Sequence, residues 1–462
     1  MTNYSNFIQK IFFYVIFIFF IFSLFYSINK IFETNFNINF YIYFALVVLF
    51  ITIFLAITEL FLKSYQVTLV IILYTSLLSL YLFEFFITTK INSIKLKNHI
   101  PFHVLADEKN ISWDERTSYE FYIDLKKEVK DILPNFYPYL LLKKNIFNGL
   151  EANGKYYFPL SGISNTTTFF GNELGFFPIV KNDIYGFKNI NNDYFQKVDF
   201  VLIGDSYIEG CCTKNEDSIA GNFRKHGFKV LSFGKNGAGP LTEYAIIKEY
   251  LNKGKINYNH LIWFFFENDL QNLELELKSN FLQEYLINES FDQDLINKQP
   301  LIDKLIKEYL SEEILKEDKK YRSKTSEKEQ ISLDRNIKFD ISNFIKLYNT
   351  RSSLQLMPND KNIDTFKKIL SNVKTLVNKN NSNIYFVYIP SVETFSHYQK
   401  YQFKKPIISI IKDLDIKIID LTNAINSLDN PLSIWPFECC GHFNEKGNEL
   451  VSEFIIDEIE LK

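Results

Sequence analysis

A serine placed for nucleophilic chemistry follows an apolar run near the middle of the chain, in Val201-Leu202-Ile203-Gly204-Asp205-Ser206. The run from Phe200 to Ile203 predicts a buried parallel strand, and Gly204 permits a sharp turn directly after it. Ser206 then stands where the next helix begins, so helix N-terminal N–H groups point at any negative charge that develops beside its hydroxyl. The alternative is that Asp205 and Ser206 only cap that helix.

Three further blocks carry residues suited to the same chemistry, and they occur in a fixed order along the chain. Gly237 lies in a glycine-rich loop after the predicted strand 229–233, and Asn268 follows the predicted strand 261–266. His442 lies in a late loop just before a C-terminal helix, in a chain that has only 6 histidines. The order Ser, Gly, Asn, His, with the first three at strand ends, resembles the SGNH (GDSL-like) hydrolase family, which is named after these residues.

The resemblance covers about residues 199–462 and implies a role for each residue. Ser206 would be the nucleophile and His442 the general base. The backbone N–H groups of Ser206 and Gly237 and the side-chain amide of Asn268 would form the oxyanion hole. The fold implied is a flavodoxin-like parallel sheet flanked by helices, and the activity implied is hydrolysis of an acyl ester through an acyl-serine intermediate. No cofactor is expected.

Two positions depart from the family's pattern. The family commonly has an Asp three residues before the His, where this chain has Cys439, and a Gly two residues before the Asn, where this chain has Phe266. Glu438 is therefore a candidate for the third member of a triad, and a backbone carbonyl that orients His442 is the alternative. The departures keep open a non-catalytic relative that holds a glycan or lipid. The other alternative is an O-acyltransferase that modifies cell-envelope polysaccharide.

Strand and helix alternate regularly from residue 199 onward, which predicts a parallel α/β sheet with right-handed crossovers. The expected strands are 199–203, 229–233, 261–266, 383–389 and 416–419, with helices that include 243–252 and 363–378. A charged helical insertion at about residues 274–354 interrupts the pattern. We expect its Lys- and Glu-rich part to form solvated helices, with a lid over the site as the alternative.

Residues 99–198 predict a β-rich layer that leads into the catalytic domain, because glycines punctuate short aromatic strands there. Its segment Asn172-Glu173-Leu174-Gly175 resembles the stretch before the serine block in exported members of the family. We expect this segment to be either an edge hairpin that completes the sheet or a wall that shapes the substrate site.

Residues 1–98 predict a membrane region with three helices, at about 11–28, 40–60 and 67–89. A cleaved signal peptide is disfavoured for the first run, since no small-residue cleavage site follows it. Glu84 is expected at a solvated interface near a span end. The chain is thus predicted to be integral to a bacterial inner membrane, with the catalytic domain on the periplasmic side, where tethered members of the family usually lie.

Composition and cysteine spacing exclude several other functions. A formal net charge of -3 gives no electrostatic basis for nucleic-acid binding. The 4 cysteines form two adjacent pairs without C-x-x-C spacing, so no metal site is expected.

Since Ser206 and His442 must meet, the pairs Cys211-Cys212 and Cys439-Cys440 share one neighbourhood, and a disulfide between the pairs is expected in an oxidising compartment. The alternative is four small apolar fillers in a reduced protein.

Overall fold

The computed structural model describes residues 2–33, 38–61, 65–98, 101–324, 341–345, 347–353, 361–396, 401 and 403–460. Residues 325–340, 346 and 354 of the predicted insertion lie outside this part of the chain. The fold divides into two compact units. One contains Met1–Lys97 and Asn336–Lys361, and the other contains Asn98–Arg335 and Asn362–Lys462.

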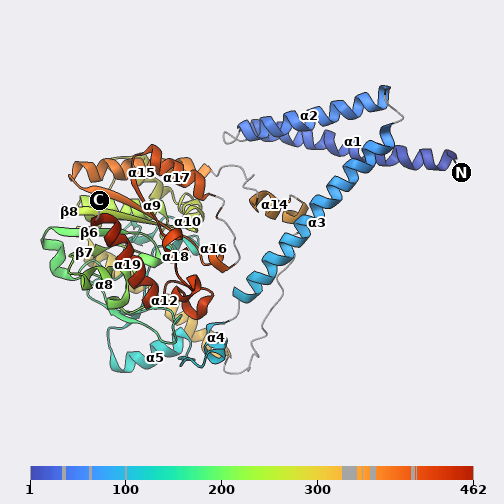
Figure 1. Ribbon diagram of the computed structural model, residues 1–462. Coiled ribbons are helices and arrows are strands. Elements are labelled where there is room, and N and C mark those ends of the chain that lie inside the picture. Colours follow the sequence, from blue (N-terminus) through green and yellow to red (C-terminus); the bar gives the residue numbers. More distant parts are fainter. Residues whose placement is uncertain are drawn as a thin grey trace. The chain divides into compact units, whose positions relative to one another are not determined.

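Three long apolar helices make up most of the first unit: α1 (Thr2–Glu33), α2 (Ile38–Phe61) and α3 (Gln66–Asn98) (Figure 1). They contain the three apolar runs of the sequence, and the stretches Lys10–Asn29, Tyr41–Leu60 and Gln66–Lys90 are long and apolar enough to cross a membrane. Many of their large apolar side chains are exposed, Phe22 and Phe50 among them. Such a surface suits lipid rather than water.

Glu84 on α3 is completely buried, so the expectation of a solvated position is wrong. Its carboxylate accepts hydrogen bonds from the backbone N–H groups of Asn349 (3.1 Å) and Thr350 (2.7 Å). These N–H groups lie at the start of α14 (Tyr348–Ser353), which follows α13 (Ile341–Ile345). A carboxylate at a helix N-terminus satisfies donors that have no partner within the helix. The end of the predicted insertion therefore belongs to the unit of the apolar helices.

A five-stranded parallel sheet forms the centre of the second unit, as the alternation of elements predicted. Its order is β10-β9-β8-β6-β7. Every neighbouring pair is parallel, and Val201 lies opposite Leu231 on one side and Leu261 on the other. In chain order this is the 2-1-3-4-5 arrangement of flavodoxin-like folds. The strands are β6 (Val198–Ile203), β7 (Val230–Ser232), β8 (Tyr258–Phe266), β9 (Asn383–Ile389) and β10 (Lys417–Asp420).

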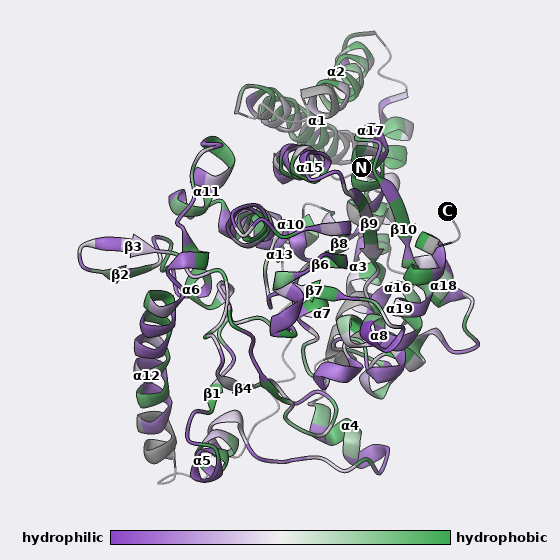
Figure 2. Cartoon of the chain, turned by 90° about the vertical axis from the view of Figure 1, so that its left-hand side faces the viewer, coloured by the Kyte–Doolittle hydropathy of each residue, from purple (hydrophilic) through white to green (hydrophobic). Residues whose placement is uncertain are grey.

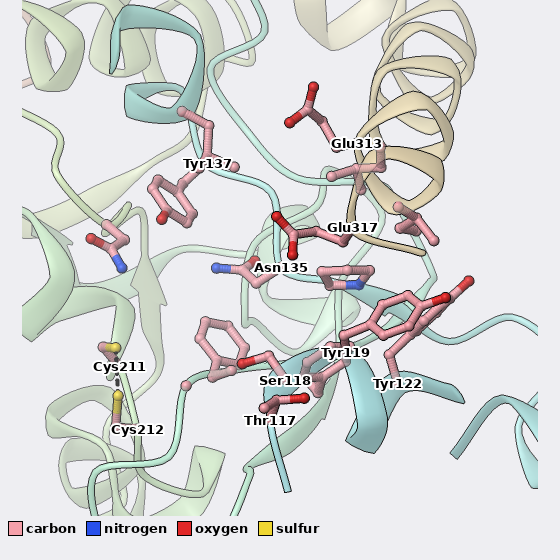
Figure 3. Close-up of a pocket in the computed structure, with 18 of the residues that line it drawn as sticks. Thr117, Ser118, Tyr119, Tyr122, Asn135, Tyr137, Cys211, Cys212, Glu313 and Glu317 are labelled. Carbon is pink, nitrogen blue, oxygen red and sulfur yellow. Dashed lines mark hydrogen bonds between the residues drawn. The ribbon is translucent and has the colours of Figure 1, made fainter. Parts of the chain in front are cut away.

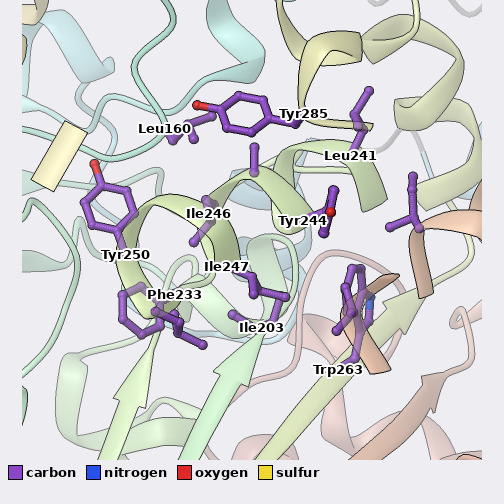
Figure 4. Packing of buried hydrophobic residues seen from close by; sticks show 14 of the residues in the cluster. Leu160, Ile203, Phe233, Leu241, Tyr244, Ile246, Ile247, Tyr250, Trp263 and Tyr285 are labelled. Carbon is purple, nitrogen blue, oxygen red and sulfur yellow. The ribbon is translucent and has the colours of Figure 1, made fainter. Parts of the chain in front are cut away.

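Helices cover both faces of this sheet because side chains alternate along each buried strand. On β6, Val201 and Ile203 belong to one core and Phe200 and Leu202 to the other. Figure 4 shows the first core around Ile203 and Trp263. It packs against α9 (Pro240–Ile246), α10 (Asp269–Glu276), α11 (Asn280–Ile287), α15 (Lys361–Lys379) and α17 (Lys404–Asp413). The second packs against α7 (Ser206–Glu209), α8 (Ile219–Lys225), α18 (Leu421–Asn426) and α19 (Glu445–Glu460).

The helix predicted over 243–252 is irregular, since α9 ends at Ile246 and the chain continues as a π-helix, Ile247–Asn252. A four-residue helix, α16 (Glu393–Ser396), follows β9. Within the insertion, α12 (Gln299–Lys324) alternates polar and apolar residues (Figure 2). Its side chains Ile302, Ile306 and Leu310 are buried in the first core. The Lys- and Glu-rich stretch that was expected to form solvated helices begins at residue 308, and within its described part Tyr309 and Leu310 are buried whereas Glu308, Ser311 and Glu312 are exposed.

The segment before β6 packs onto the same core instead of forming a separate body, and Phe158, Leu160 and Phe187 are completely or almost completely buried there. Its strands are short, in a sheet of order β1-β4-β5 and a hairpin of β2 and β3. Its elements are α4 (Phe102–Glu108), α5 (Ser118–Glu128), β1 (Leu133–Pro134), α6 (Tyr139–Lys143), β2 (Leu150–Ala152), β3 (Lys155–Tyr157), β4 (Thr167–Phe169) and β5 (Ile179–Lys181).

Candidate active site

Ser206 lies at the first position of α7, immediately beyond the carboxyl end of β6. Asp205 is the N-cap of this one-turn helix, and its side chain accepts a hydrogen bond from the N–H of Tyr207 at 3.0 Å. Capping is thus the task of Asp205, which leaves the Ser206 hydroxyl free for another partner. Gly204 is required by packing, because a Cβ there would come within 2.6 Å of the Ile208 side chain.

The partner of Ser206 is His442. The Nε2 atom of His442 lies 2.8 Å from Ser206 Oγ, while Asp205 Oδ2 lies 3.2 Å from the same oxygen. His442 belongs to the loop before α19, and Asn444 fixes the end of that loop by accepting the N–H of Gly447. The structure therefore brings together two residues that are separated by more than 200 positions, as the sequence analysis expected.

Glu173 lies on the other side of the imidazole. His442 Nδ1 donates to its carboxylate, with distances of 3.0 and 3.1 Å to the two oxygens, and the backbone N–H of His442 donates to the same group at 2.9 Å. Glu173 comes from the loop between β4 and β5, where Asn172 accepts the N–H of Gly175. The segment singled out as a hairpin or a wall thus supplies a carboxylate to His442.

Charge around the imidazole favours its protonated form. Burial alone would lower the pKa of His442, but the negative charge of Glu173, with smaller contributions from Cys211 and Asp205, raises this pKa to about 10. Burial would raise the pKa of Glu173, but His442 and, to a smaller extent, the Cys212 thiol lower it by more. The arrangement stabilises an imidazolium that has accepted a proton from Ser206.

Glu438, the acid proposed from the sequence, does not approach His442. Its carboxylate instead pairs with Lys109 at 3.0 Å and accepts a hydrogen bond from Asn430 at 3.0 Å, in an exposed position. Glu438 follows Phe437, and both have positive φ values, 58° and 52°. The turn directs the side chain to solvent, so Glu173 and not Glu438 occupies the third position of the arrangement.

The two remaining predicted residues lie beyond the strands that flank β6. Gly237 belongs to the loop after β7, and Asn268 is the N-cap residue of α10 after β8. Gly237 has a φ of 65°, and a Cβ there would come within 2.5 Å of the Tyr139 ring, so only glycine fits. The Oδ1 atom of Asn268 is buried and has no hydrogen-bond partner within the described residues. Both residues thus lie at the same edge of the sheet as Ser206.

A buried ion pair joins the Gly237 loop to the nucleophile helix. Lys235 Nζ lies 3.0 Å from Glu209 Oε1, and both side chains are almost completely buried. The other oxygen of Glu209 accepts the backbone N–H of Asn236 at 2.8 Å, and Asn135 donates to Glu209 at 3.0 Å. Through these contacts, Glu209 on α7 holds the Gly237 loop by Lys235 and Asn236, and the layer before β6 by Asn135.

The cysteines do not form the disulfide that the sequence analysis expected. Cys439 is bonded to Cys440, whereas Cys211 and Cys212 are free, buried thiols 2.7 Å apart. The expected link between the two pairs is therefore wrong, and His442 is held by Glu173 instead. The pKa of Cys212 is raised well above its ordinary value, first by the hydrogen bond with Cys211 and then by burial, so Cys212 stays a thiol rather than a competing nucleophile.

Phe266 takes part in the packing beside the base. Its ring lies 4.8 Å from the ring of Tyr207, which in turn lies 5.1 Å from the imidazole of His442. Phe443 packs on the other side of Tyr207 at 4.8 Å. An aromatic side chain where the family usually has Gly therefore supports the base loop rather than disrupting the site.

A cavity of about 680 Å³ opens beside His442, Glu173 and Asn236. Figure 3 shows Cys211 and Cys212 on one side and Tyr119 and Tyr122 on the other. The remaining lining is largely aromatic and aliphatic, and it comes from the layer before β6 and from α12 of the insertion. A cavity of this size and character is typical of a small-molecule site.

No family model and no curated protein matches the chain. Among solved structures, it is similar to a lipolytic protein of the G-D-S-L family from Desulfitobacterium hafniense, at 12% identity over 56% of this chain and 97% of that one, with a TM-score of 0.30. It is similar to a lipase/acylhydrolase from Enterococcus faecalis, at 15% identity over 57% and 95%, with a TM-score of 0.30. A catalytic mutant of an acetylxylan esterase from Geobacillus stearothermophilus matches at 10% identity over 57% and 94%, with a TM-score of 0.30. Because these sequence identities and TM-scores are low, a functional assignment depends on the geometry of Ser206, His442 and Glu173.

Proposed function

We propose that the chain is a membrane-anchored serine esterase of the SGNH type, which hydrolyses an acyl ester through an acyl-Ser206 intermediate. The observation that carries the proposal is the continuous set of hydrogen bonds from Ser206 Oγ through His442 to Glu173. It has the order and spacing of a nucleophile, a base and an orienting acid. A degenerate glycan- or lipid-binding relative has no need to retain all three.

In the first half of the reaction, Ser206 Oγ attacks the ester carbonyl while its proton moves to His442 Nε2. Glu173 accepts the Nδ1–H bond and stabilises the resulting imidazolium. The N–H groups of Ser206 and Gly237 and the side-chain amide of Asn268 are the proposed donors to the oxyanion. The tetrahedral intermediate then collapses, and the leaving alcohol takes the proton from His442. Water, activated by His442, cleaves the acyl-serine in the second half.

Transfer to an acceptor hydroxyl is the second candidate, and the position of the cavity next to His442 favours it. The cavity of about 680 Å³ is lined by His442, the proposed base, and not by Ser206, so it offers room for an acceptor alcohol next to the base. An alcohol of an envelope glycan would then take the place of water in the second half of the reaction.

The test is turnover of p-nitrophenyl acetate by purified full-length protein in detergent. We expect turnover and labelling by a fluorophosphonate, both lost in Ser206→Ala and retained in Ser427→Ala, which alters an exposed serine far along the chain. If added oligosaccharide makes the release of p-nitrophenol faster than the formation of free acetate, the acetyl group is going to the acceptor, which would favour transfer. Neither turnover nor labelling in wild-type protein would contradict the enzymatic proposal.

A further inference from the structure

Four side chains of metal-binding type converge beside the base, although the cysteine spacing gave no reason to expect a metal site. They are Glu173, Cys211, Cys212 and His442, and one ligand atom from each lies within 4.8 Å of all the others. The cysteines follow α7, Glu173 lies between β4 and β5, and His442 precedes α19. Spacing along the chain does not reveal the cluster, because three distant segments form it.

We propose that this cluster binds one zinc ion reversibly and that bound zinc blocks the active site. Two thiolates, one imidazole and one carboxylate form a ligand set typical of tetrahedral zinc, whereas Mg²⁺ and Ca²⁺ prefer oxygen ligands alone. Zinc bonds of 2.0–2.3 Å place ligand atoms about 3.3–3.8 Å apart. The present separations are 2.7 Å between the sulfurs and 3.0–3.1 Å between Nδ1 and the carboxylate oxygens, so small rotations open the site.

The cluster is accessible without unfolding. All four side chains line the cavity beside His442, and Figure 3 shows the two sulfur atoms next to each other at its edge. Both cysteines are otherwise buried, with 7% and 2% of their surfaces exposed. Zinc therefore has a route from solvent to the thiols, which each lose a proton when they bind it.

Bound zinc prevents His442 from acting as a base. In the neutral form that can act as a base, Nδ1 carries the proton that faces Glu173, and the lone pair of Nε2 faces Ser206. When zinc takes the Nδ1 lone pair, a neutral imidazole must carry its proton on Nε2, and it can no longer accept the proton of Ser206. Zinc also removes the carboxylate of Glu173 from its role. Inhibition rests on the proposed esterase function, whereas zinc binding does not.

Zinc binding is tested with reduced, desalted full-length protein in competition with a chromophoric chelator. We expect one equivalent in the wild type and in Ser206→Ala. Removal of an outer-shell partner already weakens metal sites by about 10–100-fold, so Cys211→Ser/Cys212→Ser should bind more than about 100-fold more weakly. Cys439→Ser/Cys440→Ser is the matched control and should keep the site. No uptake by the wild type, or equal uptake by Cys211→Ser/Cys212→Ser, would overturn the proposal.

Two further measurements keep the proposal testable if the double variant does not fold. In wild-type protein, zinc should slow alkylation of Cys211 and Cys212 by N-ethylmaleimide at least tenfold, and an unchanged alkylation rate would contradict the site. Saturating zinc should abolish ester turnover, and EDTA should restore it. Full turnover with zinc bound would overturn the inhibition. Zinc uptake by a wild type without turnover would instead support the site and contradict the esterase function.

Discussion

Glu173 determines both the orientation and the charge of His442, so its substitution should be costly. We expect Glu173→Gln to lower kcat roughly 10³–10⁴-fold, because an amide does not stabilise the imidazolium and favours the wrong tautomer. Glu438→Gln is the matched control, since Glu438 pairs only with exposed or solvated groups, and its rate should stay within about twofold of wild type. Equal losses of p-nitrophenyl acetate turnover in the two variants would show that Glu438 also acts on His442, contrary to the assignment of Glu173 alone.

The raised pKa of His442 predicts an unusual pH dependence. Only the neutral imidazole accepts the proton of Ser206, so activity is lost as pH falls through the pKa of His442. The charge of Glu173 outweighs burial and raises this pKa to about 10, compared with the ordinary 6.5. We therefore expect kcat/KM to keep rising above about pH 8.

The same residue provides the control for that profile. Glu173→Gln removes the negative charge, so the residual activity should reach its plateau at a lower pH than in the wild type. A wild-type plateau near pH 7, or a profile that Glu173→Gln leaves in place, would contradict the assignment of Glu173 as the main cause of the shift.

At the scale of residues, the sequence predicted that Ser206 and His442 would meet, but not that Glu173 would bind the other side of the imidazole. Ser206 and His442 stand in blocks with a recognisable order, and their atoms lie 2.8 Å apart. Glu173 is 269 positions from His442 in the chain, and no spacing rule connects them. The available signal was the block Asn172-Glu173-Leu174-Gly175, whose resemblance to a family segment marked the place without indicating a role.

At the scale of elements, the buried pair Lys235–Glu209 holds the Gly237 loop against α7. Lys235→Met leaves the buried Glu209 carboxylate without the cation that it hydrogen-bonds, with Lys188 as the other positive charge that interacts with it, and the loss of one partner of a buried pair typically costs about 3–5 kcal/mol. We expect a loss of this size in the free energy of unfolding of the second unit, with a fall in kcat from displacement of Gly237. Chemical denaturation followed by tryptophan fluorescence measures the free energy of unfolding, since Trp263 and Trp435 are buried in this unit.

Lys253→Met is the matched control for that substitution. Lys253 pairs with Asp292 at 3.2 Å, but the two side chains are 40% and 31% exposed. An exposed pair of this kind contributes about 0–1 kcal/mol. Similar losses in the two variants would show that burial of the Lys235–Glu209 pair does not hold the loop in place.

Strands were easier to predict than the elements around them. The buried strands of a parallel sheet are short apolar runs, and the predicted strand 383–389 coincides with β9 (Asn383–Ile389). The insertion was harder, because the charged stretch that begins at residue 308 belongs to the same helix as buried Ile302 and Ile306, and Leu310 within that stretch is buried too. Composition over such a long segment hides a periodic apolar face.

At the scale of the whole molecule, the sequence predicted three apolar helices before an α/β sheet, and both are present. It did not predict that residues 341–345 and 347–353 of the insertion would belong to the unit of the apolar helices. That contact depends on Glu84, whose carboxylate satisfies the N-terminus of α14. A single acid in an apolar run gives no sign of such a distant partner.

The proposed orientation places the second unit outside a cytoplasmic membrane. Three helices that all cross the membrane would put the N-terminus and the second unit on opposite sides, so an outward second unit would require an inward N-terminus. The Cys439–Cys440 bond fits an oxidising compartment, where disulfides persist. The lysines next to the spans favour the opposite orientation only slightly: Lys10 and Lys63 lie on the side of the N-terminus, and Lys30, Lys90, Lys95 and Lys97 on the other side. Long domains, moreover, translocate largely regardless of charge.

Non-reducing peptide mapping of protein alkylated in intact cells tests the compartment. We expect Cys439 and Cys440 to be protected from alkylation until a reductant is added, while denatured protein yields alkylated Cys211 and Cys212. Protease added to spheroplasts should degrade the second unit, and a cytoplasmic marker protein should survive as the control for lysis. Four freely alkylated cysteines together with a protease-resistant second unit would place that unit in the cytoplasm, because neither an external protease nor an oxidising environment would have reached it.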